Sequence, residues 1–148
     1  LGLPTFEDEG MQDDPELETQ KEEHQSYSVY EQAQRYRAAK AVLQDIYALD
    51  AEHTEAVKAL EQLWEEGYTV AAHQLGKFYR DDLSTLRDHE KAEQWFRCSA
   101  EAGNDFSEYA LGKLLLTQKR TVEALEWLDK AAEQGNQFAR YRKDLSHR

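Results

Sequence analysis

One motif recurs three times along the chain and constrains the fold more than any other feature: an amphipathic stretch that ends in glycine. The copies, aligned on Gly67, Gly103 and Gly135, are EAVKALEQLWEEGYT, KAEQWFRCSAEAGND and EALEWLDKAAEQGNQ. In every copy, apolar or small residues precede the glycine by three, four, seven, eight and eleven positions. That spacing follows one stripe along an α-helix. We therefore predict three amphipathic helices, each closed by a glycine in the left-handed conformation that commonly ends a helix.

A second motif follows the first two glycines. The segments VAAHQLGKFY and FSEYALGKLL share Leu-Gly-Lys, with Gly76 and Gly112 in the middle of the expected helix. Glycine inside a helix costs about 1 kcal/mol relative to alanine, so its repetition indicates that a neighbouring helix approaches closely there. We name these segments A-helices and the glycine-terminated segments B-helices.

The two motifs alternate, and they predict an all-α fold. No proline occurs after Pro15, which favours helix because proline breaks helix interiors. We expect a right-handed α/α superhelical repeat stack of about six helices over residues 26–148. Its repeats are expected at about 30–70, 71–106 and 107–136, with a partial A-helix at 137–148.

The first repeat is the least regular. Ser26 or Ser28 is expected to cap its A-helix, with Val42 and Ile46 on the buried face. Residues 50–54 are expected to interrupt the helical pattern before the first B-helix.

Charge is distributed unevenly along the chain. The net charge is −12; residues 1–35 contain ten Asp and Glu against Lys21 and Arg35, which gives −8 there and −4 in the rest. Residues 1–25 are therefore predicted to be an acidic, disordered leader, with ordering against a partner or folding back onto the repeats as alternatives. Such a charge disfavours direct nucleic-acid binding.

The cell location and any catalytic or metal-binding role are constrained mainly by sequence features that do not occur in the chain. We expect a cytoplasmic protein, because a single cysteine, Cys98, fits a reducing compartment and no stretch is apolar enough to enter a membrane. The five histidines show no metal-ligand spacing, and Cys98 is expected to be a half-exposed surface thiol. The sequence predicts no enzyme, metal or cofactor. The carboxylates of the B-helices are interpreted as a solvated face; they are Glu61, Glu65, Glu66, Glu123 and Glu126.

The three tryptophans have two possible roles. Trp64, Trp95 and Trp127 all lie on the apolar stripe of the B-helices. Core packing is therefore favoured over stacking on a ligand.

The order alanine, Leu-Gly, aromatic, variable loop, Ala-x-x-Trp-Phe and Ala-x-x-Gly resembles the Sel-one-like repeats, a branch of the tetratricopeptide-type α/α repeats. Residues 71–106 match best, residues 107–138 form a shortened copy and residues 30–70 a degenerate one. The resemblance implies a non-catalytic protein–protein interaction scaffold. Two features depart from the family pattern: residues 81–84 replace its glycine-rich loop, and Arg142 stands where the last A-helix glycine is expected.

A second resemblance suggests an alternative function. The segments LEQLWEEGYTVAAHQLGK and EYALGKLLL are similar to repeat tails of bacterial conjugative relaxases. This similarity implies an accessory C-terminal domain that assists assembly of a DNA-transfer complex. The metal-binding histidine pair and nucleophilic tyrosine of those enzymes do not occur in these residues.

The A-helices supply the candidate site. In stacked α/α repeats, equivalent positions of the A-helices form rows across the concave face. One expected row is Lys77, Lys113 and Lys143, and the row one turn earlier is His73, Tyr109 and Ala139. We predict a basic, partly aromatic groove for a protein or acidic peptide partner; the alternative is that the lysines only aid solubility. The predicted partner-binding residues are His73, Lys77, Arg80, Tyr109, Lys113, Arg140 and Lys143. Weak homodimerisation through residues 137–148 or through the first helix is a further expectation.

Overall fold

The computed structural model describes the backbone of residues 15–81 and 88–146, and side chains from residue 28 to residue 142 within those ranges. In these ranges the chain forms seven α-helices and no strand, which confirms the all-α prediction. The helices are α2 (Pro15–Gln44), α3 (Asp50–Glu65), α4 (Val70–Asp81), α5 (His89–Glu101), α6 (Asp105–Thr117), α7 (Thr121–Glu133) and α8 (Gln137–Ser146).

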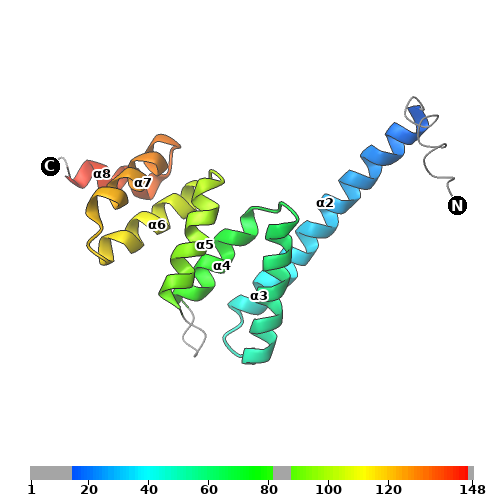
Figure 1. The fold of residues 1–148 in the computed structure, drawn as a ribbon, viewed down its shortest axis with the longest axis horizontal. Coiled ribbons are helices and arrows are strands. Elements are labelled where there is room, and N and C mark those ends of the chain that lie inside the picture. Colours follow the sequence, from blue (N-terminus) through cyan, green and yellow to red (C-terminus); the bar gives the residue numbers. More distant parts are fainter. Residues whose placement is uncertain (1–14, 82–87, 147–148) are drawn as a thin grey trace, which may run out of the picture.

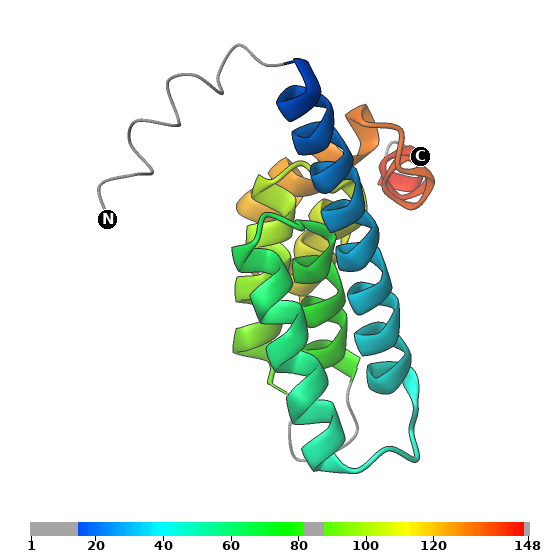
Figure 2. The same ribbon diagram turned by 90° about the vertical axis from the view of Figure 1, so that its right-hand side faces the viewer.

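Consecutive helices pack against each other and form an arc, with α2 at one end and α8 at the other (Figure 1). The A-helices are α4, α6 and α8, and the B-helices are α3, α5 and α7. Helix α2 precedes α3 as the A-helix of the first pair, and it also contacts α4. The second view shows α2 running beside this stack (Figure 2).

Each B-helix ends as its sequence predicts. Gly67, Gly103 and Gly135 have φ angles of 93°, 96° and 95°, the left-handed conformation that glycine adopts without strain. The asparagines after the last two glycines then cap the next A-helix. Asn104 accepts a hydrogen bond from the Ser107 amide at 3.0 Å, and Asn136 accepts one from the Ala139 amide at 3.0 Å.

The two glycines inside A-helices lie where a B-helix crosses closely, as predicted. A Cβ at Gly76 would lie 2.6 Å from the Phe96 ring, and one at Gly112 would lie 2.7 Å from Cγ of Leu128. Real Cβ atoms do not approach other atoms so closely. The missing side chain therefore sets the distance between the two helices of each pair.

The B-helix stripe forms the core together with the inner faces of the A-helices. Leu60, Leu63, Phe96 and Ala124 are completely buried. Trp64, Trp95 and Trp127 are half-buried and pack against this core, and the rings of Trp64 and Trp95 meet edge-to-face at 6.3 Å. The packing role predicted for the tryptophans is confirmed.

Helix α2 differs from its prediction at both ends. It starts at Pro15 instead of near Ser26 or Ser28, so residues 15–25 are helical. Arg35 contacts the end of α3, and the part of α2 before that level extends beyond α3 (Figure 1). Residues 1–14 lie outside the described range, and an acidic leader there stays a prediction.

The buried face of α2 also differs. Tyr36 and Ala39 are buried, whereas Ile46 lies outside the helix and is exposed. The chain turns at residues 45–49, where the Asp45 carboxylate accepts a hydrogen bond from the Tyr47 amide at 2.9 Å. Aspartate commonly stabilises turns in this way. The expected break at residues 50–54 is therefore wrong, because α3 already begins at Asp50.

Two of the B-helix carboxylates join helices. Glu66, at the end of α3, pairs with Arg35 of α2 at 2.7 Å. This Arg35 contact, with Gln32 and Gln62 assisting, lowers the pKa of Glu66 to about 2. Glu123 of α7 pairs with Arg97 of α5 at 2.7 Å. These two residues are thus ion-pair partners rather than part of a merely solvated face.

The Arg97–Glu123 pair belongs to a ring of four charges. Arg120 contacts Glu123 at 2.8 Å and Glu93 at 3.1 Å, and Arg97 closes the ring at 3.3 Å from Glu93. The ring ties α5 to α7 on the B-helix side of the stack.

Candidate protein-binding surface

A ring four residues before a lysine recurs on three successive A-helices, as tyrosine on α2 and α6 and as histidine on α4. On α6, the Lys113 ammonium lies 5.2 Å from the centre of the Tyr109 ring; on α2, the Lys40 ammonium lies 5.9 Å from the Tyr36 ring. Helix α4 carries a histidine and a lysine at the same spacing. Residues four apart share one helix face, so each pair presents a ring beside a cation. We call these six residues the aromatic–lysine ladder: Tyr36, Lys40, His73, Lys77, Tyr109 and Lys113.

The first step of the ladder was missed by the sequence analysis. Tyr36 and Lys40 surround Ala38 and Ala39, where later A-helices have Leu-Gly. The motif that located the other two steps is therefore absent. The spacing of an aromatic residue four positions before a lysine would have predicted this step from the sequence.

The predicted row is displaced by two residues on α8. Ala139 is 1% exposed, and its amide is capped as that of Ser107 is, so Ala139 is equivalent to buried Ser107 rather than to Tyr109. Tyr141 occupies the position of Tyr109. Lys143 consequently precedes the position equivalent to Lys113; its side chain lies outside the described residues.

The same register moves Arg142 away from the A-helix glycine position, which Asp144 occupies. The expected substitution of that glycine by Arg142 is therefore wrong.

Aromatic contacts connect neighbouring A-helices along the ladder. The centre of the His73 ring lies 6.4 Å from that of Phe106, and the Tyr109 ring stacks on Phe138 at 5.7 Å. Phe106 and Phe138 each follow a B-helix glycine by three residues, and both are exposed. This repeated position was visible in the sequence, but the prediction did not use it.

His73 is held by a polar chain between three helices. Its Nδ1 lies 2.5 Å from the Ser107 hydroxyl of α6, which donates to the Ser99 hydroxyl of α5 at 2.6 Å. Burial, followed by the positive charges of Lys77 and Arg80, lowers the pKa of His73 to about 4. The charge of Lys40 acts in the same direction and Asp105 opposes it. His73 is thus neutral at pH 7, in a locally positive environment on an acidic molecule.

The two predicted arginines have different surroundings. The Arg80 guanidinium lies 5.3 Å from the centre of the Phe96 ring and pairs with Asp81 at 2.6 Å. Arg80 thus combines an ion pair within α4 with a ring contact to α5. Arg140 is exposed, at the position equivalent to buried Glu108.

Few of the described residues offer other chemistry. Cys98 is half-buried, and burial together with the charge of Glu101 raises the pKa of its thiol, which disfavours the nucleophilic thiolate. Among the described side chains, no three His, Cys, Asp or Glu residues are placed to hold a metal ion. Neither does any described helix have the length and apolar character needed to cross a membrane.

Comparison with known proteins agrees with this architecture. The model of the Sel1 repeat family matches residues 69–104 and 106–136. The solved structure of a Sel1 repeat protein from Oxalobacter formigenes is similar, with a TM-score of 0.58 and 26% sequence identity over 75% of this chain and 86% of that one. A search of curated proteins found no match. The agreement of motif, glycine-dependent packing and fold shows that this chain carries a Sel1-like repeat domain.

Proposed function

We propose that this chain is a non-catalytic protein–protein interaction scaffold whose aromatic–lysine ladder binds an acidic peptide segment of a partner. Sel1 repeats generally mediate protein interactions, which supports the general role. The observation that carries the specific proposal is the repetition of a ring and a lysine four residues apart on α2, α4 and α6, with the lysine placed over the ring on α2 and α6. Packing of the stack does not require a cation at this position on three A-helices.

The chemistry of the ladder fits a carboxylate-bearing chain. Lys40, Lys77 and Lys113 place positive charges at equivalent positions, while the net charge of the molecule is −12. An acidic segment is thus attracted to this face and repelled from most others, which favours one binding orientation. The half-buried rings of His73 and Tyr109 provide apolar surface for the backbone and side-chain stems of the peptide, whereas the ring of Tyr36 is buried in the core.

The repeat also predicts a spacing for the ligand. Packed helices lie about 8–10 Å apart. A peptide in the polyproline II conformation advances about 3.1 Å per residue with three residues per turn, so every third side chain returns to the face that meets the ladder. We therefore expect a peptide with an acidic residue at about every third position to bind better than one with the same composition in a single block.

The test is the affinity of a fluorescent Glu/Ser peptide with glutamate at every third position, measured by anisotropy. We expect the double variant Lys77→Glu/Lys113→Glu to weaken binding at least roughly tenfold, because both cations become repulsive. The matched control replaces two lysines outside the ladder, Lys58→Glu/Lys130→Glu. Lys58 is exposed on α3, and Lys130 lies 4.4 Å over the Trp127 ring of α7. Equal losses in both double variants, or no loss in the first, would contradict the proposal.

A second measurement reports on the ladder directly. Bound carboxylates near His73 stabilise its imidazolium, so the pKa of His73 should rise from about 4 when the peptide binds. An NMR titration of the His73 ring protons, with and without peptide, checks this. An unchanged pKa at saturating peptide would place the ligand elsewhere.

A further inference from the structure

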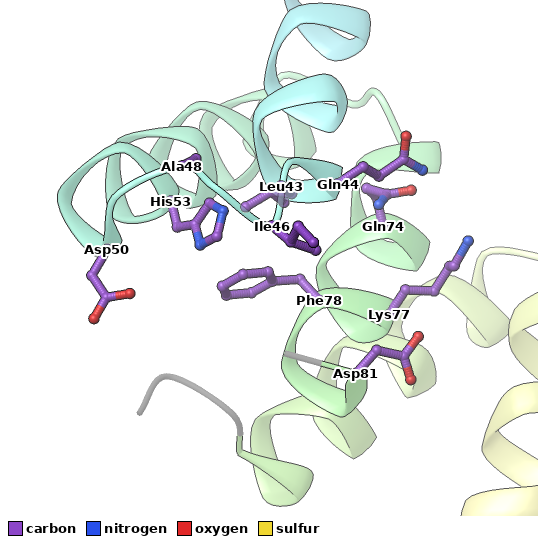
Figure 3. Close-up of a pocket in the computed structure, with 10 residues that line it drawn as sticks. All are labelled: Leu43, Gln44, Ile46, Ala48, Asp50, His53, Gln74, Lys77, Phe78 and Asp81. Atoms are coloured by element: carbon purple, nitrogen blue, oxygen red, sulfur yellow. The ribbon is translucent and has the colours of Figure 1, made fainter. Parts of the chain in front are cut away.

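A pocket lies beside the second step of the ladder, where the turn between α2 and α3 meets α4 (Figure 3). Its volume is about 560 Å³, which is in the range of small-ligand pockets. Leu43, Ile46, Ala48 and Phe78 supply its apolar lining. Lys77 is both a ladder residue and a residue of the pocket wall.

The turn that forms one side of this pocket exposes an unusual amount of apolar surface. Ile46, Tyr47 and Leu49 are 80%, 88% and 68% exposed, within four residues of sequence. Single exposed apolar residues are common, but a contiguous group beside a concave site is typical of an interaction surface. The group contributes little to the described core, so its apolar surface is free to contact a ligand.

The turn is nevertheless held in place. Nε2 of His53 donates to the backbone carbonyl of Asp45 across 3.1 Å, and the His53 ring meets Phe78 edge-to-face at 5.6 Å. His53 is buried, and its Nδ1 has no hydrogen-bond partner among the described residues. One imidazole thus connects the turn, α3 and α4, so the pocket is built into the fold.

The charges at the pocket rim point to the kind of group it accepts. Asp81 is already paired with Arg80, and Asp50 lies in the first turn of α3. These two carboxylates disfavour a further acidic group inside the pocket, while Lys77, which also lines it, belongs to the ladder. A ligand that places an apolar side chain inside the pocket and keeps its own carboxylates outside matches this distribution of charge.

We propose that the peptide bound by the ladder inserts one large apolar side chain into this pocket, so the ligand is an acidic segment with a hydrophobic anchor. This inference rests on the proposed function, because the ladder supplies the orientation of the peptide. Ile46 forms part of the pocket wall, so the anchor side chain covers the share of the exposed apolar surface that Ile46 contributes. Leucine, phenylalanine or tryptophan fits the size of the cavity.

The experiment uses the spaced Glu/Ser peptide and a series in which each serine in turn is replaced by leucine or phenylalanine. We expect one position to raise affinity by roughly tenfold, because burying a large apolar side chain in the pocket removes its surface from water. The variants Ile46→Ser, which removes part of the wall, and Ala48→Trp, which fills the cavity, should abolish this gain. Both should leave the affinity for the unsubstituted peptide unchanged.

The matched control is Val122→Ser, because Val122 is 77% exposed on α7 and does not line the pocket. This variant should keep the full gain. If no position increases affinity, or if the gain survives both pocket variants, the anchor is overturned while the ladder proposal stands on its response to Lys77→Glu/Lys113→Glu. If the unsubstituted peptide does not bind, or ignores that double variant, the proposed function itself fails and the anchor with it.

Discussion

The first helix pair and the two Sel1 repeats build the same architecture with different contacts. In α4–α5 and α6–α7, a glycine lets the B-helix approach until Phe96 or Leu128 touches the A-helix backbone. In α2–α3 the comparable position is Ala39, and an Arg35–Glu66 ion pair fastens the end of α3 to α2. The family model matches only the glycine-containing repeats. The aromatic–lysine pair, however, is present in both regions, so the surface feature is independent of the motif that defines the family.

The largest expected effect concerns the glycine contact. Gly76→Ala places a methyl group against the Phe96 ring, and we expect it to lower the free energy of unfolding by about 2–3 kcal/mol, as overpacking does. In the first pair, the opposite change Ala39→Gly should cost about 1–2 kcal/mol, because it loses helix propensity and one buried methyl group. Urea unfolding of both variants measures the difference.

A double variant identifies the cause. Phe96→Leu removes the ring that meets the new methyl group, so Gly76→Ala should cost less in the Phe96→Leu background than in the wild type. Equal costs in the two backgrounds would show that the glycine is not needed for the close approach to Phe96.

A smaller effect distinguishes the two Sel1 repeats, because α4 carries His73 where α6 carries Tyr109. The pKa of His73 is lowered from 6.5 to about 4 in the folded state. Between these values the unfolded chain binds a proton that the folded chain does not, so stability falls as the pH decreases from 6.5 to 4. With partial exposure taken into account, we expect a loss of about 1–2 kcal/mol over this range. His73→Tyr, which copies the next repeat, should remove this part of the pH dependence. A wild-type profile that is flat between pH 6.5 and 4 would contradict the assignment.

The smallest expected effect concerns the ion pair of the first helix pair. Glu66→Gln should increase hydrogen exchange in the part of α2 around Arg35, while Glu65→Gln, one residue away and exposed, should not. Because the pKa of Glu66 is lowered from 4.5 to about 2, the contribution of the pair is present above pH 4.5 and is lost as the pH falls toward 2. Identical exchange in both variants at pH 7 would show that the pair does not hold α2.

Sequence periodicity was sufficient where a pattern recurred. Three copies of the B-helix stripe located Gly67, Gly103 and Gly135, and two copies of Leu-Gly-Lys located the close helix crossings. Each repetition fixed the helical register, because a position that is buried in one copy is buried in the next. The half-buried tryptophans followed from the same stripe.

Prediction failed where a helix had no second copy for comparison. Ile46 was predicted to lie on the buried face of α2, because apolar spacing alone does not reveal that the chain turns at Asp45. The predicted register of α8 was based on aligning Lys143 with the other lysines. The hydrogen bond from the Ala139 amide to Asn136 instead fixes a register in which Tyr141 takes the ladder position. The pocket could not be predicted, since it depends on a turn that the sequence analysis had read as helix.

Beyond the aromatic contact of Trp64 with Trp95 between α3 and α5, the two edges of the stack are held by different kinds of contact. Along the A-helices, the His73 ring contacts Phe106 and the Tyr109 ring stacks on Phe138. Along the B-helices, Arg97 forms an ion pair with Glu123. An ion pair between partly exposed side chains weakens as the ionic strength rises, whereas a contact between neutral rings is not screened. Salt therefore acts on the junction of α5 with α7 and leaves the ring contacts between the A-helices unchanged.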